Sequence, residues 1–460
     1  MNVHGIDVTI QNIPLLDTGY IPMAAFTRAF ERSAQGGKEL VIAVERNQGQ
    51  IAARRVNIHG TATMEQADRV YVERTVKMLL WAYGGWKVSI CGDDRLGAFI
   101  ANVYAKGGAR AFDADFMSRV YERDFVVESL SLEAAPQEHS VASPVGRHLD
   151  GCRIGFDAGG SDRKVSAVVD GVPVYSEEVV WYPKTNSDPD YHYQGILDAF
   201  RCAASKMPRV DAIGVSSAGI YVDNRAMVAS LFIQVPRDEF DQKVKDIYIR
   251  AAKELGDIPL VVANDGDVTA LAGAMSLEEN RILGIAMGTS EAAGYVDGDG
   301  NITGWLNELA FAPVDLQAEA MQDEWSGDIG CGVKYFSQDS VIKLAPRAGI
   351  ALEDSLSPAE KLKVVQAAMN DGSEGARDIY RTIGVYLGHT LAYYADFYAI
   401  SHVLLLGRVM SGEGGDLVIA EARRVLSEEY PDVTMELHLP DEKIRRVGQS
   451  VAAASLPEIL

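Results

Sequence analysis

The sequence predicts an α/β protein with two lobes, preceded by an additional N-terminal α/β domain. Segments that alternate like strands and segments with helical spacing follow one another along the whole chain. Residues 136–150, rich in small residues and prolines, interrupt this pattern and are typical of a linker. Two glycine-rich turns, at 157–164 and 288–294, each stand between predicted strands, and another strand between them ends in an aspartate.

The composition limits the classes of partner. The chain has 460 residues, 47% of them hydrophobic, which is enough for two or three cores. Its formal net charge of -22 argues against nucleic acid and against an anionic membrane surface as partners. No apolar run is long enough to span a bilayer, and the first residues do not resemble a signal peptide. The four cysteines form no CxxC pair, so we expect free thiols in a reducing cytoplasm.

The N-terminal domain is predicted to cover residues 1–135. Its expected elements are two strands joined by a turn at 47–49, a helix at 65–83, a strand at 86–92, helices at 96–104 and 113–121, and a strand at 125–134. No basic recognition helix is present, so we predict that this domain does not bind DNA. A lid, a dimer surface and a substrate-contacting domain all remain open as its role.

After the linker, the pattern predicts a second set of strands and helices. Antiparallel strands are expected at 152–181, and further strands at 210–219, 259–265 and 402–407. A hairpin with a DGDGN turn is expected at 282–304. Helices are expected at 191–207, 237–255, 358–369 and 375–399.

The first glycine-rich turn offers a place for phosphate. It contains Asp157, Gly159, Gly160, Ser161 and Lys164. Glycines let the backbone approach a phosphate closely, and a strand-end carboxylate such as Asp157 can hold magnesium through water. An ordinary hairpin turn is the alternative interpretation.

Two later glycine-rich segments suit the other parts of a nucleotide. Gly288, Thr289 and Ser290 offer small residues and hydroxyls between two strands. Gly407 and Gly412 follow a strand, in a loop that can hold an adenosine against the backbone. A turn and a strand-to-helix loop are the alternatives.

The strand-end aspartate is Asp265, within Asn264-Asp265-Gly266-Asp267. A carboxylate there can accept a hydroxyl proton. The alternative is a plain helix N-cap, a position that Asn and Asp often fill. Together, the glycine-rich turns and Asp265 are the parts of a two-lobed phosphoryl-transfer site, which needs positioned phosphates, a metal and a base.

With these motifs in this order, residues 153–454 resemble the ROK family of sugar kinases and repressors, within the actin/hexokinase-like (ribonuclease H-like) superfamily. IGFDAGGSDRK looks like its D-x-G-G-T-x-x-K phosphate motif, IGVSSAGIYVD like its G-x-G-x-P-G-x-V-D stretch, and VVANDGDVTALAGA like its N-D-x-N-x-x-A-x-x-E segment. MGTSEAAGYVDGDGNITG looks like its second phosphate hairpin. The resemblance implies ATP and Mg²⁺ as cofactors, Asp265 as catalytic base, and substrate contacts from Asn264, Glu308, Ser217 and Gly219.

The resemblance also implies a domain division and an assembly. A first lobe is expected at 151–268, completed by a C-terminal helix at about 444–460, and a second lobe at 269–443. A homodimer is possible by the same comparison.

The sequence departs from the family pattern where the family binds zinc. Phe311 stands at the position of a histidine that contacts sugar and binds zinc, and Cys331 is alone where the family has a cysteine cluster. A closed zinc site needs four ligands, so we predict no zinc site there. Arg408 replaces a glycine of the adenosine loop, and Ala218 replaces a proline.

The sequence therefore predicts an ATP-dependent kinase that phosphorylates a hydroxyl of a sugar or a sugar derivative. The alternative is a regulatory protein that binds ATP or a sugar without turnover. A transcriptional repressor is the third reading, and the acidity and the N-terminal pattern disfavour it.

Overall fold

The chain forms two compact units. The structure, a computed structural model, describes residues 1–140, 145–440 and 448–459. Unit 1 comprises Met1–Val141, Ile285–Ala293 and Trp305–Leu439, and unit 2 comprises Ala142–Gly284, Gly294–Gly304 and Pro440–Leu460.

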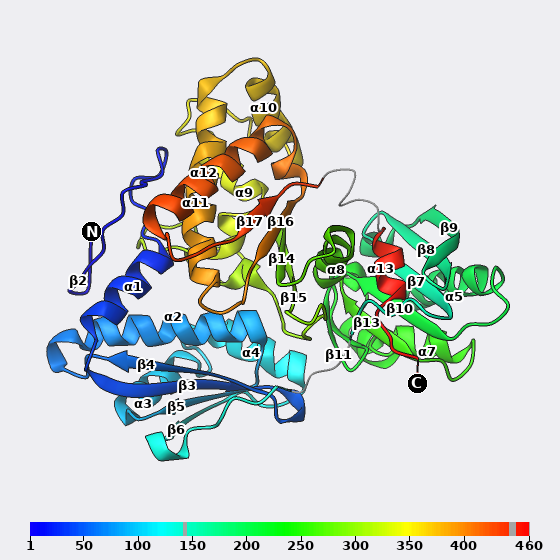
Figure 1. Cartoon of the computed structure of the whole chain (residues 1–460), viewed down its shortest axis with the longest axis horizontal. Coiled ribbons are helices and arrows are strands. Elements are labelled where there is room, and N and C mark those ends of the chain that lie inside the picture. Colours follow the sequence, from blue (N-terminus) through cyan, green and yellow to red (C-terminus); the bar gives the residue numbers. More distant parts are fainter. Residues whose placement is uncertain (141–144, 441–447, 460) are drawn as a thin grey trace. The chain divides into compact units, whose positions relative to one another are not determined.

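Unit 1 begins with a four-stranded sheet in the order β4-β3-β5-β6. Its strands are β3 (Lys38–Glu45), β4 (Ile51–Ile58), β5 (Lys87–Cys91) and β6 (Val126–Leu130). Strand β3 is antiparallel to β4 and β5, and β5 is parallel to β6. The helices of this region are α1 (Met23–Ser33), α2 (Glu65–Tyr83), α3 (Asp94–Val103) and α4 (Ala111–Tyr121), and Figure 1 shows α2 along one face of the sheet. The predicted strands and helices of this region are confirmed.

The rest of unit 1 consists of helices and most of a second sheet; residues 282–284 and 294–296 of its first two strands belong to unit 2. The sheet has the order β15-β14-β16-β17 and consists of β14 (Ile282–Met287), β15 (Glu291–Val296), β16 (His402–Leu406) and β17 (Glu436–His438). The helices are α9 (Gln338–Leu344), α10 (Pro358–Asn370), α11 (Glu374–Tyr394) and α12 (Glu413–Glu429). Helices α11 and α12 pack tightly, because a Cβ at Gly384 or Gly388 would lie 2.6 Å from a side chain of α12.

Buried hydrogen bonds join the N-terminal residues to α11. The Tyr386 hydroxyl donates to Asp17 Oδ2 at 2.6 Å, and His389 Nε2 lies 3.1 Å from the carbonyl oxygen of Asn12. Residues 1–135 thus have their own sheet but share a compact unit with Trp305–Leu439. Their independence as a domain stays a prediction.

Six charged side chains form a buried cluster in unit 1, which we call the six-charge cluster. Its members are Glu73, Arg74 and Lys77 of α2, Asp113 of α4, Arg110 just before α4, and Asp328. Asp328 contacts three cations, with distances of 2.6 Å from Arg110 Nη1, 3.1 Å from Arg74 Nη1 and 3.3 Å from Lys77 Nζ. Three positive and three negative charges balance, so the N-terminal helices and the segment around Asp328 are held to one another by ion pairs.

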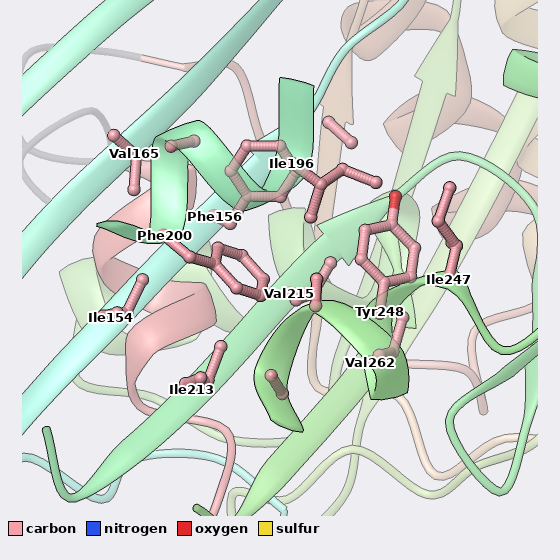
Figure 2. Packing of buried hydrophobic residues seen from close by; sticks show 14 of the residues in the cluster. Ile154, Phe156, Val165, Ile196, Phe200, Ile213, Val215, Ile247, Tyr248 and Val262 are labelled. Carbon is pink, nitrogen blue, oxygen red and sulfur yellow. The ribbon is translucent and has the colours of Figure 1, made fainter. Parts of the chain in front are cut away.

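Unit 2 is built on a five-stranded sheet in the order β13-β10-β7-β8-β9. The strands are β7 (Cys152–Ala158), β8 (Asp162–Val169), β9 (Val172–Val180), β10 (Ala212–Ser217) and β13 (Leu260–Asn264). A small hairpin of β11 (Ile220–Val222) and β12 (Arg225–Val228) follows β10. The helices include α5 (Pro189–Ala204), α7 (Ile247–Lys253), α8 (Asp265–Leu277) and α13 (Gln449–Ala454). Figure 2 shows Phe156, Phe200 and Tyr248 packed among aliphatic side chains in the core of this unit.

Glycines let α13 approach the sheet of unit 2. A Cβ at Gly214 of β10 would overlap the carbonyl oxygen of Ala453, and one at Gly155 of β7 would overlap that of Ser450. Backbone atoms on α13 cannot yield as a flexible side chain can, so the helix would have to move outward.

Gly214→Ala is therefore expected to destabilise the protein by about 1–3 kcal/mol, the usual cost of overpacking. The measurement is the free energy of unfolding in urea. Gly448→Ala is the matched control, because Gly448 precedes the same helix with φ of -67° and has nothing within 4 Å of its would-be Cβ. Equal stability of the Gly214 variant and the wild type would contradict the close packing of α13.

Four predicted elements differ from the structure. The helix expected at 237–255 is split into α6 (Arg237–Glu239), a π-helix (Phe240–Val244) and α7. The split occurs because the carbonyl oxygen of Lys245 accepts a hydrogen bond from the backbone N–H of Ala226 and not from a residue of the same helix. The DGDGN segment does form a turn, after which Ile302 bridges back to Val296, but the predicted hairpin contains a further turn at Gly288–Ser290 between β14 and β15. Of the C-terminal helix expected at about 444–460, residues 444–447 and 460 lie outside the described residues, and within the rest the helix covers only Gln449–Ala454; residues 441–443 of the predicted second lobe also lie outside the described residues. The lobe boundary at 268/269 falls inside the continuous helix α8.

Residues 141–144 of the predicted linker also lie outside the described residues. Among the residues that the structure describes, no helix is both long and apolar enough to cross a membrane.

Candidate nucleotide and substrate site

Three parallel strands of unit 2 end at one edge of the sheet and carry the candidate residues there. The register pairs Ser216 of β10 with Asp157 of β7, and Ser217 of β10 with Asn264 of β13. Asp265 follows β13 directly as the first residue of α8. In open α/β sheets, ligands bind outside the carboxyl ends of the strands, which is where these side chains lie.

Asp157 is buried, with 9% of its surface exposed, and is held in place by a chain of hydrogen bonds. Ser216 Oγ donates to Asp157 Oδ1 at 2.9 Å, and Gln449 Nε2 donates to Ser216 Oγ at 2.9 Å. Burial raises the pKa of Asp157 to about 6; the Ser216 hydrogen bond opposes this rise, and the Asp265 carboxylate adds to it. Two mutually repelling carboxylates suit a site for a cation.

Asp265 is half-buried at the start of α8. Burial raises its pKa, while backbone N–H groups at the helix start and the Lys184 ammonium oppose the rise. A carboxylate of raised proton affinity is a better acceptor for a hydroxyl proton.

Asp267, the nearest rival of Asp265, has another role. It is buried, and its Oδ1 accepts a hydrogen bond from the backbone N–H of Tyr295 at 3.1 Å. This bond ties α8 to β15, so Asp267 is a structural carboxylate.

The first glycine-rich turn lies beside these aspartates. Trp181 Nε1 donates to the carbonyl oxygen of Gly159 at 2.7 Å, which fixes the turn. A Cβ at Gly160 would lie 3.1 Å from Lys184 Cε, so the Lys184 side chain extends over the turn.

Lys184 was missed by sequence reasoning, because a lone exposed lysine after a strand carries no pattern. The predicted phosphate ligand Lys164 is engaged locally, with its Nζ 3.5 Å from Asp162 Oδ1 and 3.9 Å from Glu178 Oε2. Ser161 Oγ donates to Asp162 Oδ2 at 3.0 Å at the exposed tip of the turn.

Three predicted substrate contacts of unit 2 have structural roles. Ser217 is fully buried, and its hydroxyl is shared with Tyr221 at 2.6 Å and Tyr248 at 2.8 Å, so we assign it to the core. Asn264 caps α8, with Oδ1 accepting from the Gly266 N–H at 2.7 Å. Asn264 Nδ2 donates to the carbonyl oxygen of Gly219 at 2.7 Å, and Gly219 makes a turn at φ of 136°. The helix N-cap considered as the alternative for this motif is therefore present, and Asn264 is the capping residue.

Unit 1 contains the second glycine-rich turn and the adenosine loop. The Gly288 N–H donates to the carbonyl oxygen of Ser290 at 3.0 Å, and Thr289 is exposed. Gly407 follows β16 with φ of 96°, and a Cβ there would overlap the backbone of Met287. The two predicted nucleotide loops of unit 1 are therefore neighbours. Gly412, with φ of 67°, directly precedes α12.

Glu308 lies close to a second carboxylate that sequence reasoning missed. Glu291, at the start of β15, is buried, and neither of its oxygens has a hydrogen-bond partner among the described residues. Burial raises its pKa well above the ordinary value, and Glu308 raises it further. In the sequence, Glu291 stands among small residues (GTSEAAG), and no local pattern there indicates that its side chain is buried.

Phe311 and Cys331 both have packing roles. Phe311 packs against Trp81 in a tilted arrangement, with ring centroids 4.4 Å apart, and belongs to an aromatic group with Phe112 and Phe116. Cys331 Sγ is buried 3.6 Å from Asp328 Oδ2, and burial raises the pKa of its thiol to about 12.

Solved structures match this fold, although no family model and no curated protein matches the chain. A ROK hexokinase from Thermus thermophilus matches with a TM-score of 0.52 at 18% identity, covering 66% of this chain and 97% of the hexokinase. A ROK family glucokinase from Streptomyces griseus, in complex with glucose and AMPPNP, matches with a TM-score of 0.47 at 20% identity over 67% of this chain and 99% of its own. A ROK family transcriptional regulator, a homologue of the E. coli MLC protein, matches with a TM-score of 0.49 at 16% identity over 67% and 79%.

The hexokinase match shows that the chain has an actin/hexokinase-like fold. Over the 66% of the chain that is matched, the fold is that of a ROK hexokinase, so the predicted fold class is confirmed there. The additional N-terminal domain and the site residues stay predictions.

Proposed function

We propose that this protein transfers the terminal phosphoryl group of ATP to a hydroxyl of a sugar or a sugar derivative, with Asp265 as general base. The observation that carries the proposal is the placement of Asp157 and Asp265 at the carboxyl ends of β7 and β13, the two parallel strands that flank β10, beside the Gly159–Ser161 turn. Phosphoryl transfer needs little from a protein beyond positioned phosphates, neutralised charge and a base.

Each residue of this group has a part in the proposed reaction. Asp265 orients the acceptor hydroxyl and takes its proton as the new phosphorus–oxygen bond forms. The backbone of the Gly159–Ser161 turn holds phosphate oxygens. Glu308 stays the proposed carboxylate for the acceptor, by resemblance alone.

A magnesium ion fits the chemistry of Asp157. Its carboxylate is held rigid by Ser216, and a cation nearby would relieve its repulsion from Asp265. When bound, Mg²⁺ would supply charge neutralisation for the phosphates.

Lys184 is proposed to contact the phosphate chain from above the turn. Lys184→Ala is expected to weaken ATP binding by about 10- to 150-fold, because a hydrogen bond to a charged group contributes about 1.5–3 kcal/mol. The measurement is the Kd of Mg-ATP by titration calorimetry. Lys253→Ala, at an exposed lysine of α7, is the control and should leave the Kd unchanged. Equal affinity in the two variants would remove Lys184 from the site.

The function is tested by ADP release. The purified chain, ATP and Mg²⁺ are incubated with a panel of hexoses, amino sugars and N-acetylated sugars, and ADP formation is followed with and without each acceptor. Acceptor-dependent ADP formation supports the kinase. ATP binding without ADP formation on any acceptor contradicts it.

That second outcome would favour a protein that binds ATP or a sugar without turnover. One observation supports this second candidate: Phe311, at the family's sugar-contacting histidine, is buried among aromatic side chains. Sugar-dependent thermal stabilisation without turnover would then be expected.

A further inference from the structure

We propose that His402, Glu436 and His438 bind a divalent transition-metal ion such as Zn²⁺, at a site in unit 1 made of other residues than those at the family's zinc position. The cluster lies on two neighbouring parallel strands, β16 and β17, with His402 in register with Glu436. Side chains two residues apart on a strand share a face, so Glu436 and His438 project to the same side as their neighbour His402.

The donor atoms already converge. His402 Nδ1 lies 3.1 Å from His438 Nε2, and Glu436 Oε2 lies 3.9 Å and 3.8 Å from these two nitrogens. All three donor atoms lie within 4.8 Å of one another. Tetrahedral ligands with metal–nitrogen bonds of about 2.0–2.1 Å stand about 3.3 Å apart. The two nitrogens fit this spacing without movement of the strands.

The carboxylate needs a small adjustment. Its distances exceed the tetrahedral separation by about half an ångström. The Glu436 side chain is 73% exposed and can rotate, while the histidines are 14% and 22% exposed and are held in place. Two fixed imidazoles with one adjustable carboxylate form a preorganised site with an open position for water.

A hydrogen bond between the two imidazoles explains the 3.1 Å distance between their facing nitrogens. One ring then donates an N–H to the other. Metal binding needs both facing nitrogens as lone-pair donors, so the donating ring shifts its proton to its other nitrogen. Neutral imidazole and borderline metals such as Zn²⁺ suit one another, and two nitrogens with a carboxylate are a set that such ions accept.

The place of the cluster indicates a structural task. His402 begins β16, and the predicted adenosine loop at Gly407 follows its other end, about 13 Å away for a strand of this length. Strand β17 has three residues and stands at the edge of its sheet. A metal ion shared by β16 and β17 would fasten this short edge strand.

The test uses the full chain after chelator treatment and dialysis. Titration calorimetry with ZnCl₂ is expected to give one zinc ion per chain. His402→Gln and His438→Gln are each expected to weaken binding by at least about 10-fold, and Glu436→Gln by less. His139→Gln is the matched control, because His139 is exposed and lies outside the cluster. Circular dichroism verifies that each variant is folded.

Two results would overturn the proposal. One is zinc binding by the His402→Gln/His438→Gln double variant that equals the wild type. The other concerns Co²⁺ added to the wild type, which keeps the test valid if the variants do not fold. Co²⁺ bound by two nitrogens and one oxygen at a low coordination number is expected to give strong visible absorption bands. A spectrum identical to that of hydrated Co²⁺ would overturn the proposal.

Discussion

Asp265→Asn is expected to lower the rate of ADP formation by about 100- to 10,000-fold, the range for a lost general base. Asn keeps the shape of Asp but cannot take a proton from the acceptor hydroxyl. ATP affinity and stability should remain nearly unchanged, because the Asp265 side chain is half-buried at a helix start that Asn264 already caps. The measurement is the initial rate of ADP formation with the acceptor found in the panel.

Asp267→Asn is the comparison variant, two residues further along α8. Its side-chain oxygen can still accept the hydrogen bond from the Tyr295 N–H, so turnover should be largely kept. Full activity of the Asp265 variant would refute its role as base. Loss of activity in the Asp267 variant alone would move that role to Asp267.

Asp328→Asn is expected to destabilise the protein by about 3–5 kcal/mol, the cost of breaking a buried ion pair by removing one partner. The change leaves Arg74, Lys77 and Arg110 facing two carboxylates in place of three. The measurement is the free energy of unfolding in urea at pH 7. Asp115→Asn, at a carboxylate that is 74% exposed, is the control and should cost less than about 1 kcal/mol.

The pH dependence gives an independent check. Burial raises the pKa of Asp328, but the neighbouring cations outweigh it and hold that pKa far below the ordinary value. A carboxyl whose folded pKa is lowered contributes stability above its unfolded pKa and loses it as the pH falls. The wild type should therefore lose more stability than the Asp328 variant between pH 5 and pH 3, a window set by an unfolded Asp pKa of about 3.9. Parallel curves would contradict the cluster.

Local elements were predictable because neighbouring residues specify them. The helix predicted at 65–83 is α2, which ends where Gly84 adopts φ of 85°. The turn at Gly159–Gly160 was likewise predictable from its two glycines, and the start of α8 at Asp265 from the capping residue Asn264 before it. The helix expected at 237–255 failed because a distant backbone N–H, that of Ala226, competes for the carbonyl oxygen of Lys245.

The missed residues have partners far away in the sequence. Lys184 is defined only by its closeness to Gly160, and Glu291 only by burial near Glu308. Arg74 and Asp328 are separated by 254 positions. Hydrophobic periodicity places Lys77 on a predicted helix but does not indicate that its side chain is buried, although Lys77 is fully buried in the structure. A single sequence contains no signal for such pairings.

The six-charge cluster has a consequence for the order in which the chain assembles during translation. Asp328 follows Asp113 by about 215 residues, which a ribosome adds in roughly 10–40 s at 5–20 residues per second. Until then, the three cations of the cluster have only Glu73 and Asp113 to neutralise them. The nascent N-terminal helices therefore carry an unbalanced positive charge on a surface that is buried in the folded chain. Their final packing requires that Asp328 has been synthesised.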